Sequence, residues 1–226
     1  MKKQKVISVN LDPGVSELPY TPDIDVRDYI SLGDIMDKYM LGPNGALIMA
    51  ADLVATEIEN LRKNIEDFDA DYVLVDTPGQ IELFAFRESG PYIINEITTE
   101  QTVILYLFDS TFSLNPQNYI SNIFLANAVY TRFNRPMINI LAKTDLVSKK
   151  NIEKILEWGE ESMALEEAVE ETDSNIKRLM SRGFMQLFSQ LGLIPSLLPV
   201  SSKKEEGFIQ LHAALMRIFA GGEERI

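Results

Sequence analysis

Cysteine is absent from the 226-residue chain, and histidine occurs only once, as His212. Without thiols the chain cannot form disulfide bonds or thiolate metal sites. A single imidazole also excludes a histidine-cluster zinc site, and no Ser/His/Asp arrangement is indicated. Because a cysteine-free chain suits a reducing compartment, we expect a cytoplasmic protein.

Positive charge and long apolar runs are also scarce. Lys and Arg number 21 against 34 Asp and Glu, which gives a formal net charge of −13. Nucleic-acid binding depends on clustered Lys and Arg, so a broad nucleic-acid surface is not expected. The first apolar stretch, Val6–Val9, is too short for a signal peptide, and no run approaches the ~18 residues of a membrane span. The sequence therefore predicts a protein that binds neither nucleic acid nor membranes.

A further absence concerns phosphate binding. Many nucleotide triphosphatases hold phosphate groups with a G-x-x-x-x-G-K-[ST] loop. None of the 12 glycines of this chain is followed by lysine, so the loop does not occur in it. Any nucleotide chemistry must be inferred from other residues.

What the sequence does contain is an alternation of apolar runs with amphipathic segments. Nearly continuous apolar runs are typical of parallel strands covered on both faces, and their alternation with helices predicts an α/β fold. We expect an open, doubly wound, mostly parallel sheet with helices on both faces. The predicted strands are Val6–Val9, Tyr72–Val75, Thr102–Phe108, Met137–Leu141 and Leu197–Val200.

Helical patterns fill the intervals between these runs. Ser31 followed by Asp34 is typical of a helix start. Further helices are predicted over Leu47–Ile65, Pro116–Phe133, Lys149–Leu165, Asp173–Leu191 and Glu206–Phe219. We predict one domain over residues 1–226, in which residues from about 149 to 195 form a helical insertion before the last strand. Residues 157–173 carry acidic and no basic side chains, which indicates either a solvated face or a docking surface for a basic partner.

The most informative motif is Asp76-Thr77-Pro78-Gly79-Gln80, which follows a predicted strand directly. Open α/β sheets bind ligands at the carboxyl ends of their strands. In phosphoryl transfer a carboxylate there can hold Mg²⁺, the N–H of Gly79 can meet a γ-phosphate, and Gln80 can orient the attacking water. An ordinary turn is the alternative, because Asp, Pro and Gly all favour turns.

The segment Ala142-Lys143-Thr144-Asp145 follows the next-but-one predicted strand. A carboxylate at Asp145 can accept both N1–H and N2–H of guanine, a pair of donors that adenine does not offer, and the stem of Lys143 can lie over the base. Such a K-x-D pattern also occurs in surface turns. Ser201, after the last predicted strand, lies where a backbone N–H can contact the base oxygen.

Two other turns leave both a structural and a functional interpretation open. Asp12 follows the first predicted strand, so it can position water or support Mg²⁺, or simply form the turn. Gly42-Pro43-Asn44-Gly45 lies between two predicted helices. Locally, a glycine that ends a helix, a proline and an asparagine N-cap explain this segment.

Taken together, the motifs resemble those of the archaeal and eukaryotic GPN-loop GTPases, which belong to the signal-recognition-particle-like class of P-loop GTPases. The resemblance runs from about Val6 to the C-terminus. Its specificity comes from the order and spacing of four segments: Val9-Asn10-Leu11-Asp12-Pro13, Asp25-Val26-Arg27-Asp28, Leu41-Gly42-Pro43-Asn44-Gly45-Ala46 and Asp76-Thr77-Pro78-Gly79-Gln80-Ile81-Glu82.

The resemblance implies a GTP-hydrolysing homodimer or pseudo-dimer whose nucleotide sites face a shared interface. The Gly42-Pro43-Asn44 loop of one protomer would reach the γ-phosphate site of the other. Asp12 and Gln80 would position the hydrolytic water, and Asp76, supported by Asp12, would serve Mg²⁺. The remaining implied nucleotide-binding residues are Gly42, Pro43, Asn44, Gly79, Lys143, Asp145 and Ser201. The implied partners are GTP or GDP, a second copy of the chain, and proteins whose assembly the family assists.

The sequence departs from the family pattern in two respects. Ala142 replaces the asparagine, serine or threonine that normally precedes the lysine, which predicts weaker guanine binding without a change of base. The strand, phosphate loop and helix that open the family's domain are absent. We therefore expect a strand missing beside the one that ends at Asp76, and impaired phosphate binding.

Two hypotheses follow. In the first, this is a GPN-loop GTPase whose sequence as given lacks its opening unit. In the second, it is a non-hydrolysing interaction protein that has lost phosphate binding and acts as a dimer partner. The intact Asp12, Asn44, Asp76 and Gln80 favour the first hypothesis, and Ala142 favours the second.

Overall fold

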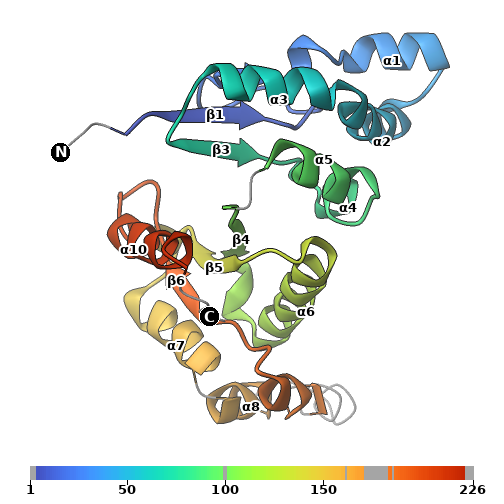
Figure 1. Cartoon of the computed structure of the whole chain (residues 1–226). Helices are drawn as coiled ribbons and strands as arrows, with labels where there is room; N and C mark the ends of the chain where they lie inside the picture. The colour runs from blue at the N-terminus through green and yellow to red at the C-terminus, as the bar shows by residue number, and fades with distance from the viewer. Residues whose placement is uncertain (1–3, 99–100, 161, 171–182, 185, 222–226) are drawn as a thin grey trace. The chain divides into compact units, whose positions relative to one another are not determined.

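The computed structural model describes residues 4–98, 101–160, 162–170, 183–184 and 186–221 (Figure 1). Its contacts divide the chain into two compact units, Met1–Glu100 and Gln101–Ile226, and each unit is described below by itself. The single domain expected over residues 1–226 stays a prediction. Among the described residues, no helix is both long and apolar enough to cross a membrane.

The sheet of the first unit is three-stranded and parallel, with the order β2-β1-β3. It consists of β1 (Val6–Asn10), β2 (Ile24–Asp25) and β3 (Tyr72–Asp76). The register places Asn10 beside both Asp25 and Asp76. Parallel strands end at the same edge of a sheet, so three polar side chains meet at the carboxyl edge of this one.

The helices of the first unit are η1 (Val26–Asp28), α1 (Leu32–Tyr39), α2 (Pro43–Leu53), η2 (Val54–Glu57), α3 (Ile58–Asp67), α4 (Ile81–Phe84) and α5 (Ser89–Ile97). The predicted start of α1 is confirmed, because the Oγ of Ser31 accepts the N–H of Asp34 at 3.2 Å. The continuous helix expected over Leu47–Ile65 is broken by the 3-10 turn η2. The apolar spacing nevertheless continues through the break, since Ala50, Val54, Ile58 and Leu61 are all buried.

The local interpretation of the segment between α1 and α2 was wrong in two details. Met40, in a left-handed conformation, ends α1, so Gly42 is not the residue that stops this helix. Gly42 is instead the N-cap of α2, Pro43 occupies the first turn, and Asn44 lies inside the helix. The fixed φ of proline suits the first helical position, where its missing N–H is not needed.

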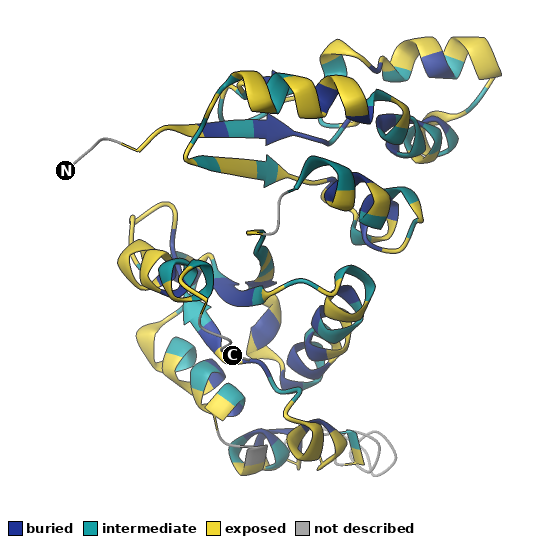
Figure 2. Ribbon diagram, in the orientation of Figure 1, coloured by how far each residue is buried: buried dark blue, intermediate teal, exposed yellow. Residues whose placement is uncertain are grey.

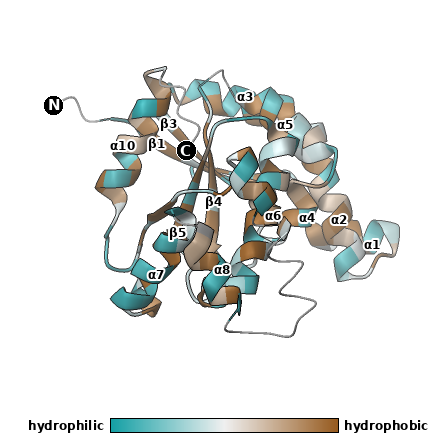
Figure 3. Cartoon of the chain, turned by 90° about the horizontal axis from the view of Figure 1, so that it is seen from below, coloured by the Kyte–Doolittle hydropathy of each residue, from teal (hydrophilic) through white to brown (hydrophobic). Residues whose placement is uncertain are grey.

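The second unit has a three-stranded parallel sheet with the order β4-β5-β6. Its strands are β4 (Ile104–Asp109), β5 (Met137–Ala142) and β6 (Leu197–Pro199). Its helices are η3 (Phe112–Leu114), α6 (Pro116–Phe133), η4 (Thr144–Leu146), α7 (Lys149–Glu160), α8 (Ser162–Glu170) and α10 (Phe208–Phe219). Figure 3 shows hydrophobic residues concentrated on the strands, whereas α3 and α7 mix hydrophobic with hydrophilic residues.

Strand β5 supplies both faces of the core of this unit. Leu141 packs in a cluster with residues of α6, α7 and α8, such as Tyr119, Trp158 and Leu165. Ile138 and Ile140, which point to the opposite face, pack with residues of α10. Helices therefore cover both faces of the sheet, and the predicted parallel α/β fold is confirmed for this unit.

The predicted helical insertion over residues 149–195 contains α7 and α8. Of the helix expected over Asp173–Leu191, residues 183–184 and 186–191 are helical, and the other residues lie outside the described part of the chain.

Strands β3 and β4 each have a neighbour on one side only, within the described residues. Some of their apolar side chains are exposed: Leu74 is 58% exposed on β3, and Leu107 is 62% exposed on β4, although Phe108 of β4 is buried. Figure 2 shows the contrast between exposed β3 and buried β5. Unpaired apolar strand edges are normally covered in folded proteins, so these two edges are places where another strand can pair.

Candidate functional site

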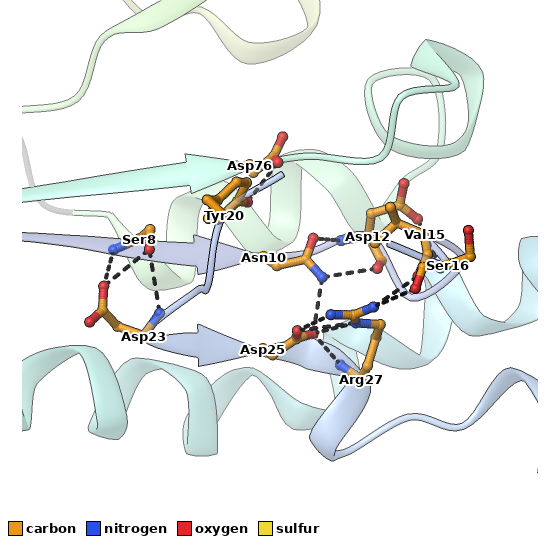
Figure 4. A network of polar contacts seen from close by, with 11 residues as sticks. Ser8, Asn10, Asp12, Val15, Ser16, Tyr20, Asp23, Asp25, Arg27 and Asp76 are labelled. Atoms are coloured by element: carbon orange, nitrogen blue, oxygen red, sulfur yellow. Dashed lines mark hydrogen bonds and ion pairs between the residues drawn. The ribbon is translucent and has the colours of Figure 1, made fainter. Parts of the chain in front are cut away.

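The first group of candidate residues lies at the carboxyl edge of the β2-β1-β3 sheet (Figure 4). Asp76 ends β3, and its carbonyl oxygen accepts the N–H of Leu11 at 2.8 Å, so the chain after β1 starts its turn against β3. Asp12 therefore follows β1 at the edge at which Asp76 ends β3. The sequence-based placement of these two carboxylates at the same edge of a sheet is confirmed in the structure, which also shows that their strands are neighbours.

Tyr20 contacts Asp76 directly. Its hydroxyl donates to Oδ2 of Asp76 at 2.7 Å, and the donor belongs to the loop between β1 and β2. Burial and this hydrogen bond together raise the pKa of Tyr20 above its usual range. The phenol therefore stays protonated and remains a donor, and Oδ1 is the oxygen of Asp76 that Tyr20 leaves available.

The backbone of Asp12 is held by a fully buried side chain, that of Asn10. Asn10 Oδ1 accepts the N–H of Asp12 at 3.0 Å, and Asn10 Nδ2 donates to the carbonyl of Asp12 at 3.2 Å. The carboxylate of Asp12 uses Oδ1 to accept the N–H of Gly14 at 2.9 Å. Asp12 is therefore fixed in an Asx-type turn.

The segment after Asp76 is open to solvent except at Pro78, which is buried. Gly79 and Gln80 are both exposed, and a Cβ placed on Gly79 would meet no atom within 4 Å. Gln80 is the N-cap of the short helix α4, but its side chain makes no capping hydrogen bond. There is therefore free space around the backbone of Gly79, and the side-chain amide of Gln80 does not cap α4.

The Gly42-Pro43-Asn44 segment starts α2, and Asn44 is exposed in the first turn of this helix. The far end of α2 is tied to the segment that follows α4. Asp52 accepts the Nε of Arg87 at 2.7 Å, a second hydrogen bond from Nη2 of the same side chain, and the hydroxyl of Ser89 at 2.9 Å. The hydrogen bonds from Arg87 hold the pKa of Asp52 below its usual range.

The second group of candidate residues lies at the carboxyl edge of β4-β5-β6. Lys143 follows β5 in a left-handed conformation, with φ 59° and ψ 36°. Its Nζ lies 2.8 Å from Oδ2 of Asp109, which ends β4. The Lys143 ammonium, followed by the Thr111 hydroxyl, holds the pKa of Asp109 well below its usual range.

Asp145 and Ser201 meet although 56 residues separate them in sequence. The hydroxyl of Ser201 donates to Oδ1 of Asp145 at 2.7 Å, and this hydrogen bond lowers the pKa of the carboxyl group. Ser201 is fully buried, and its Oγ accepts the N–H of Lys204 at 3.1 Å. The predicted base-binding residues Lys143, Asp145 and Ser201 are thus brought to one edge of one sheet.

Gly207 closes the loop that carries Ser201. Its φ of 87° lies in the region that glycine tolerates, and a Cβ there would come within 2.1 Å of the carbonyl oxygen of Pro199. Any other residue would therefore have to displace either the end of β6 or the loop that begins with Ser201.

The donor set fits Mg²⁺ that is carried by a nucleotide. No group of three or more His, Cys, Asp or Glu in the described residues could hold a metal ion by itself. Mg²⁺ typically keeps several waters and uses one or two carboxylates together with substrate phosphates. Asp76 is exposed at a strand end and supplies one such carboxylate, and Asp12 lies at the same edge.

Several residues of these sites were not assigned a role from the sequence. Asn10, Asp25 and Arg27 were noted only as parts of motifs, although they form a connected polar network. Asp109 carried the same signal as Asp76, since it is a carboxylate that directly follows an apolar strand. Tyr20 carried no local signal, because its partner lies 56 residues away in sequence.

The fold and the carboxylates at its strand ends define an α/β protein of the P-loop NTPase-like class. A family model described as "conserved hypothetical ATP binding protein" matches residues 1–221. The chain is 32% identical to the GPN-loop GTPase PAB0955 of Pyrococcus abyssi over 209 residues, which make up 92% of this chain and 83% of that protein. The chain belongs to the family of GPN-loop GTPases.

A solved structure supports the same assignment. The crystal structure of PAB0955, described as a GTPase in the apo form, aligns with a TM-score of 0.81 at 31% sequence identity, over 95% of this chain and 86% of that one. The chain is also 32% identical over 190 residues to GPN-loop GTPase 1 of Dictyostelium discoideum and 34% identical over 183 residues to GPN-loop GTPase QQT2 of Arabidopsis thaliana. It spans about half the length of these two relatives, 47% and 48%.

Proposed function

We propose that this protein binds GTP with Mg²⁺ and hydrolyses it as a dimer, with phosphate binding weaker than a phosphate loop would provide. The observation that carries the proposal is the position of Asp76 at the carboxyl end of β3, next to Asn10 and followed by the open backbone of Gly79. In this arrangement Asp76 can accept a hydrogen bond from Mg²⁺-bound water, and the Gly79 N–H can donate to a phosphate oxygen.

Water activation is assigned to Asp12 and Gln80. The carboxylate of Asp12 keeps Oδ2 available while Oδ1 accepts from Gly14, so it can accept a hydrogen bond from water. The exposed amide of Gln80 can both donate and accept, which suits a residue that orients a water molecule. Asn44 acts on the phosphates of the partner protomer, as the family resemblance implies, and its exposure at the start of α2 leaves it accessible for this contact.

The base is guanine, although the matching family model is described as ATP-binding. A carboxylate at Asp145 can accept two N–H groups from guanine, whereas adenine presents an acceptor at the equivalent ring position. Ser201 occupies one acceptor position on Oδ1 of Asp145, and a carboxylate has about four such positions. Ala142 offers no side-chain amide, so the loop holds the base more weakly.

The proposal is tested by titrating the purified chain with GTP and ATP in the presence and absence of Mg²⁺, followed by phosphate-release measurements. We expect GTP to bind more tightly than ATP, with an affinity weaker than micromolar. Asp76→Asn should abolish the Mg²⁺ dependence of binding and leave the preference for GTP over ATP unchanged. Submicromolar binding would contradict impaired phosphate binding, and equal affinity for ATP would contradict the assignment of the base.

A second candidate function is favoured by Ala142, which offers no side-chain amide next to Lys143. In this alternative the protein is a non-hydrolysing dimer partner in protein assembly. Sedimentation and phosphate release together separate the two candidates, because this function requires a dimer that releases no phosphate from GTP. A dimer that hydrolyses GTP supports the first function.

A further inference from the structure

Asn10 is the centre of a polar network that encloses the start of the loop after β1 (Figure 4). Its side chain is fully buried, and its amide holds both the N–H and the carbonyl of Asp12. The same Nδ2 donates to Oδ1 of Asp25 at 2.9 Å. The orientation of the amide is fixed by these partners, because one side must accept and the other must donate.

The carboxylate of Asp25 also binds the side chain of Arg27, which extends the network. The guanidinium of Arg27 forms a two-pronged contact with the Asp25 carboxylate, with Nε at 3.0 Å from Oδ1 and Nη2 at 2.6 Å from Oδ2. Burial alone would raise the pKa of Asp25, but hydrogen bonds from Arg27 and Asn10 outweigh it and hold the pKa below its usual range. The carboxylate therefore stays charged and keeps both partners.

The guanidinium also reaches the far side of the loop. Nη1 of Arg27 donates to the carbonyl of Val15 at 3.0 Å and to that of Ser16 at 3.4 Å. The path from Asn10 through Asp25 and Arg27 thus returns to the loop three to four residues after Asp12. The segment is restrained at both ends by side chains of β1, β2 and η1.

We propose that Asn10, Asp25 and Arg27 are positioning residues for Asp12, an inference that rests on the proposed role of Asp12 in orienting the hydrolytic water. A network of this kind is a poor device for stability alone, because an ion pair between partly exposed side chains, such as those of Asp25 and Arg27, contributes little to stability. Its specific effect is geometric: it holds the backbone N–H and carbonyl of Asp12 and the carbonyls of Val15 and Ser16. The carboxylate is thereby held in place before any nucleotide binds.

The test uses Arg27→Lys, which keeps the charge but cannot form the two-pronged contact or reach the loop carbonyls at the same time. The matched control is Arg62→Lys, which changes an exposed arginine of α3 whose carboxylate partners lie 3.7 Å away. Amide hydrogen exchange is measured for Asp12 and Gly14, and steady-state GTP hydrolysis is measured alongside.

In Arg27→Lys we expect at least tenfold faster exchange at Asp12 and Gly14, and kcat about 10²-fold lower, as expected for a misplaced reacting group. KM should stay within about threefold, because only the orientation of water changes. Arg62→Lys should change neither exchange nor kcat. Unchanged exchange at Asp12, or a loss confined to KM, overturns the inference.

Two further outcomes are distinguishable. If the unmodified chain hydrolyses no GTP, the proposed function fails, and hydrogen exchange alone decides whether the network holds Asp12. If Arg27→Lys does not fold, Arg27→Gln is used, since its shorter neutral amide keeps one donor for the carboxylate. Slow exchange at Asp12 and Gly14 in a folded Arg27→Gln variant then refutes the positioning role.

Discussion

If Asp145 binds guanine as proposed, replacing it by asparagine should change the preferred base from guanine to xanthine. The hydroxyl of Ser201 donates to Oδ1, so the amide oxygen of the new side chain takes the Oδ1 position and keeps that hydrogen bond. The amide nitrogen then occupies the Oδ2 position as a donor. Xanthine carries a carbonyl where guanine carries its 2-amino group, and it therefore accepts from this nitrogen.

The size of the change follows from the two N–H groups that guanine donates to a carboxylate. Each hydrogen bond to a charged group changes affinity by roughly tenfold or more. Because Asp145 is only half-buried, the lower figure applies to each bond. The ratio of GTP to XTP affinity should therefore fall by about 10²-fold, with a smaller effect on inosine triphosphate, which lacks one of the two donors.

Ligand-observed NMR competition suits this measurement, because it reports affinity ratios when binding is weak. GTP, XTP, ITP and ATP are competed against one another on the original chain and on Asp145→Asn. The control is Asp34→Asn, which changes an exposed carboxylate near the start of α1 and should leave every ratio unchanged. If Asp145→Asn still prefers GTP to XTP, the assignment of Asp145 to the base is refuted.

Three other predictions follow from contacts described above. Arg87→Met leaves the Asp52 carboxylate without its charged partner, and because both side chains are partly exposed, urea denaturation should show a loss of about 1–2 kcal/mol. The stability difference between the original chain and Asp109→Asn should be constant from about pH 5 to pH 9, because the pKa of Asp109 is lowered and that of Lys143 is raised. This difference should shrink below that range, as acid protonates Asp109, and above it, as alkali deprotonates Lys143. Leu74→Lys should reduce concentration-dependent association in light scattering without lowering Tm, because it places a charge on the exposed edge strand β3.

Each of these predictions has a control or an outcome that contradicts it. Arg62→Met removes an exposed arginine that makes only long ion pairs, so it should be close to neutral in urea. A stability difference for Asp109→Asn that grows below pH 4 would show that the Asp109 carboxylate does not favour folding. Light scattering that is the same for Leu74→Lys and the original chain would show that β3 is not the associating edge.

The sequence predicted the strand ends well, because these are fixed by short apolar runs followed by turn residues. Asp76 and Asp145 were placed correctly at sheet edges for this reason. The interruption of α2 and α3 at Val54–Glu57 was missed, because the spacing of apolar residues continues across the break. The strand β2 was also missed, since its two residues, Ile24–Asp25, carry no periodicity.

Contacts between distant segments could not be predicted from local pattern. The ion pair of Lys143 with Asp109 depends on β4 and β5 being neighbours in the register that pairs Asp109 with Ala142. The hydrogen bond from Tyr20 to Asp76 depends on the path of the loop between β1 and β2. Both are consequences of tertiary packing, which a single sequence specifies but does not display.

The two-sided packing of β5 determines how accurately the loop after it is placed. Ile138 and Ile140 belong to one apolar cluster and Leu141 to the other. A slip of one residue along the sheet would turn every side chain of this strand toward the opposite layer and disrupt both clusters at once. The position of the loop that starts at Lys143 therefore depends on apolar packing on both faces of the sheet. Substitutions that loosen either layer should weaken the proposed preference for guanine before they unfold the protein.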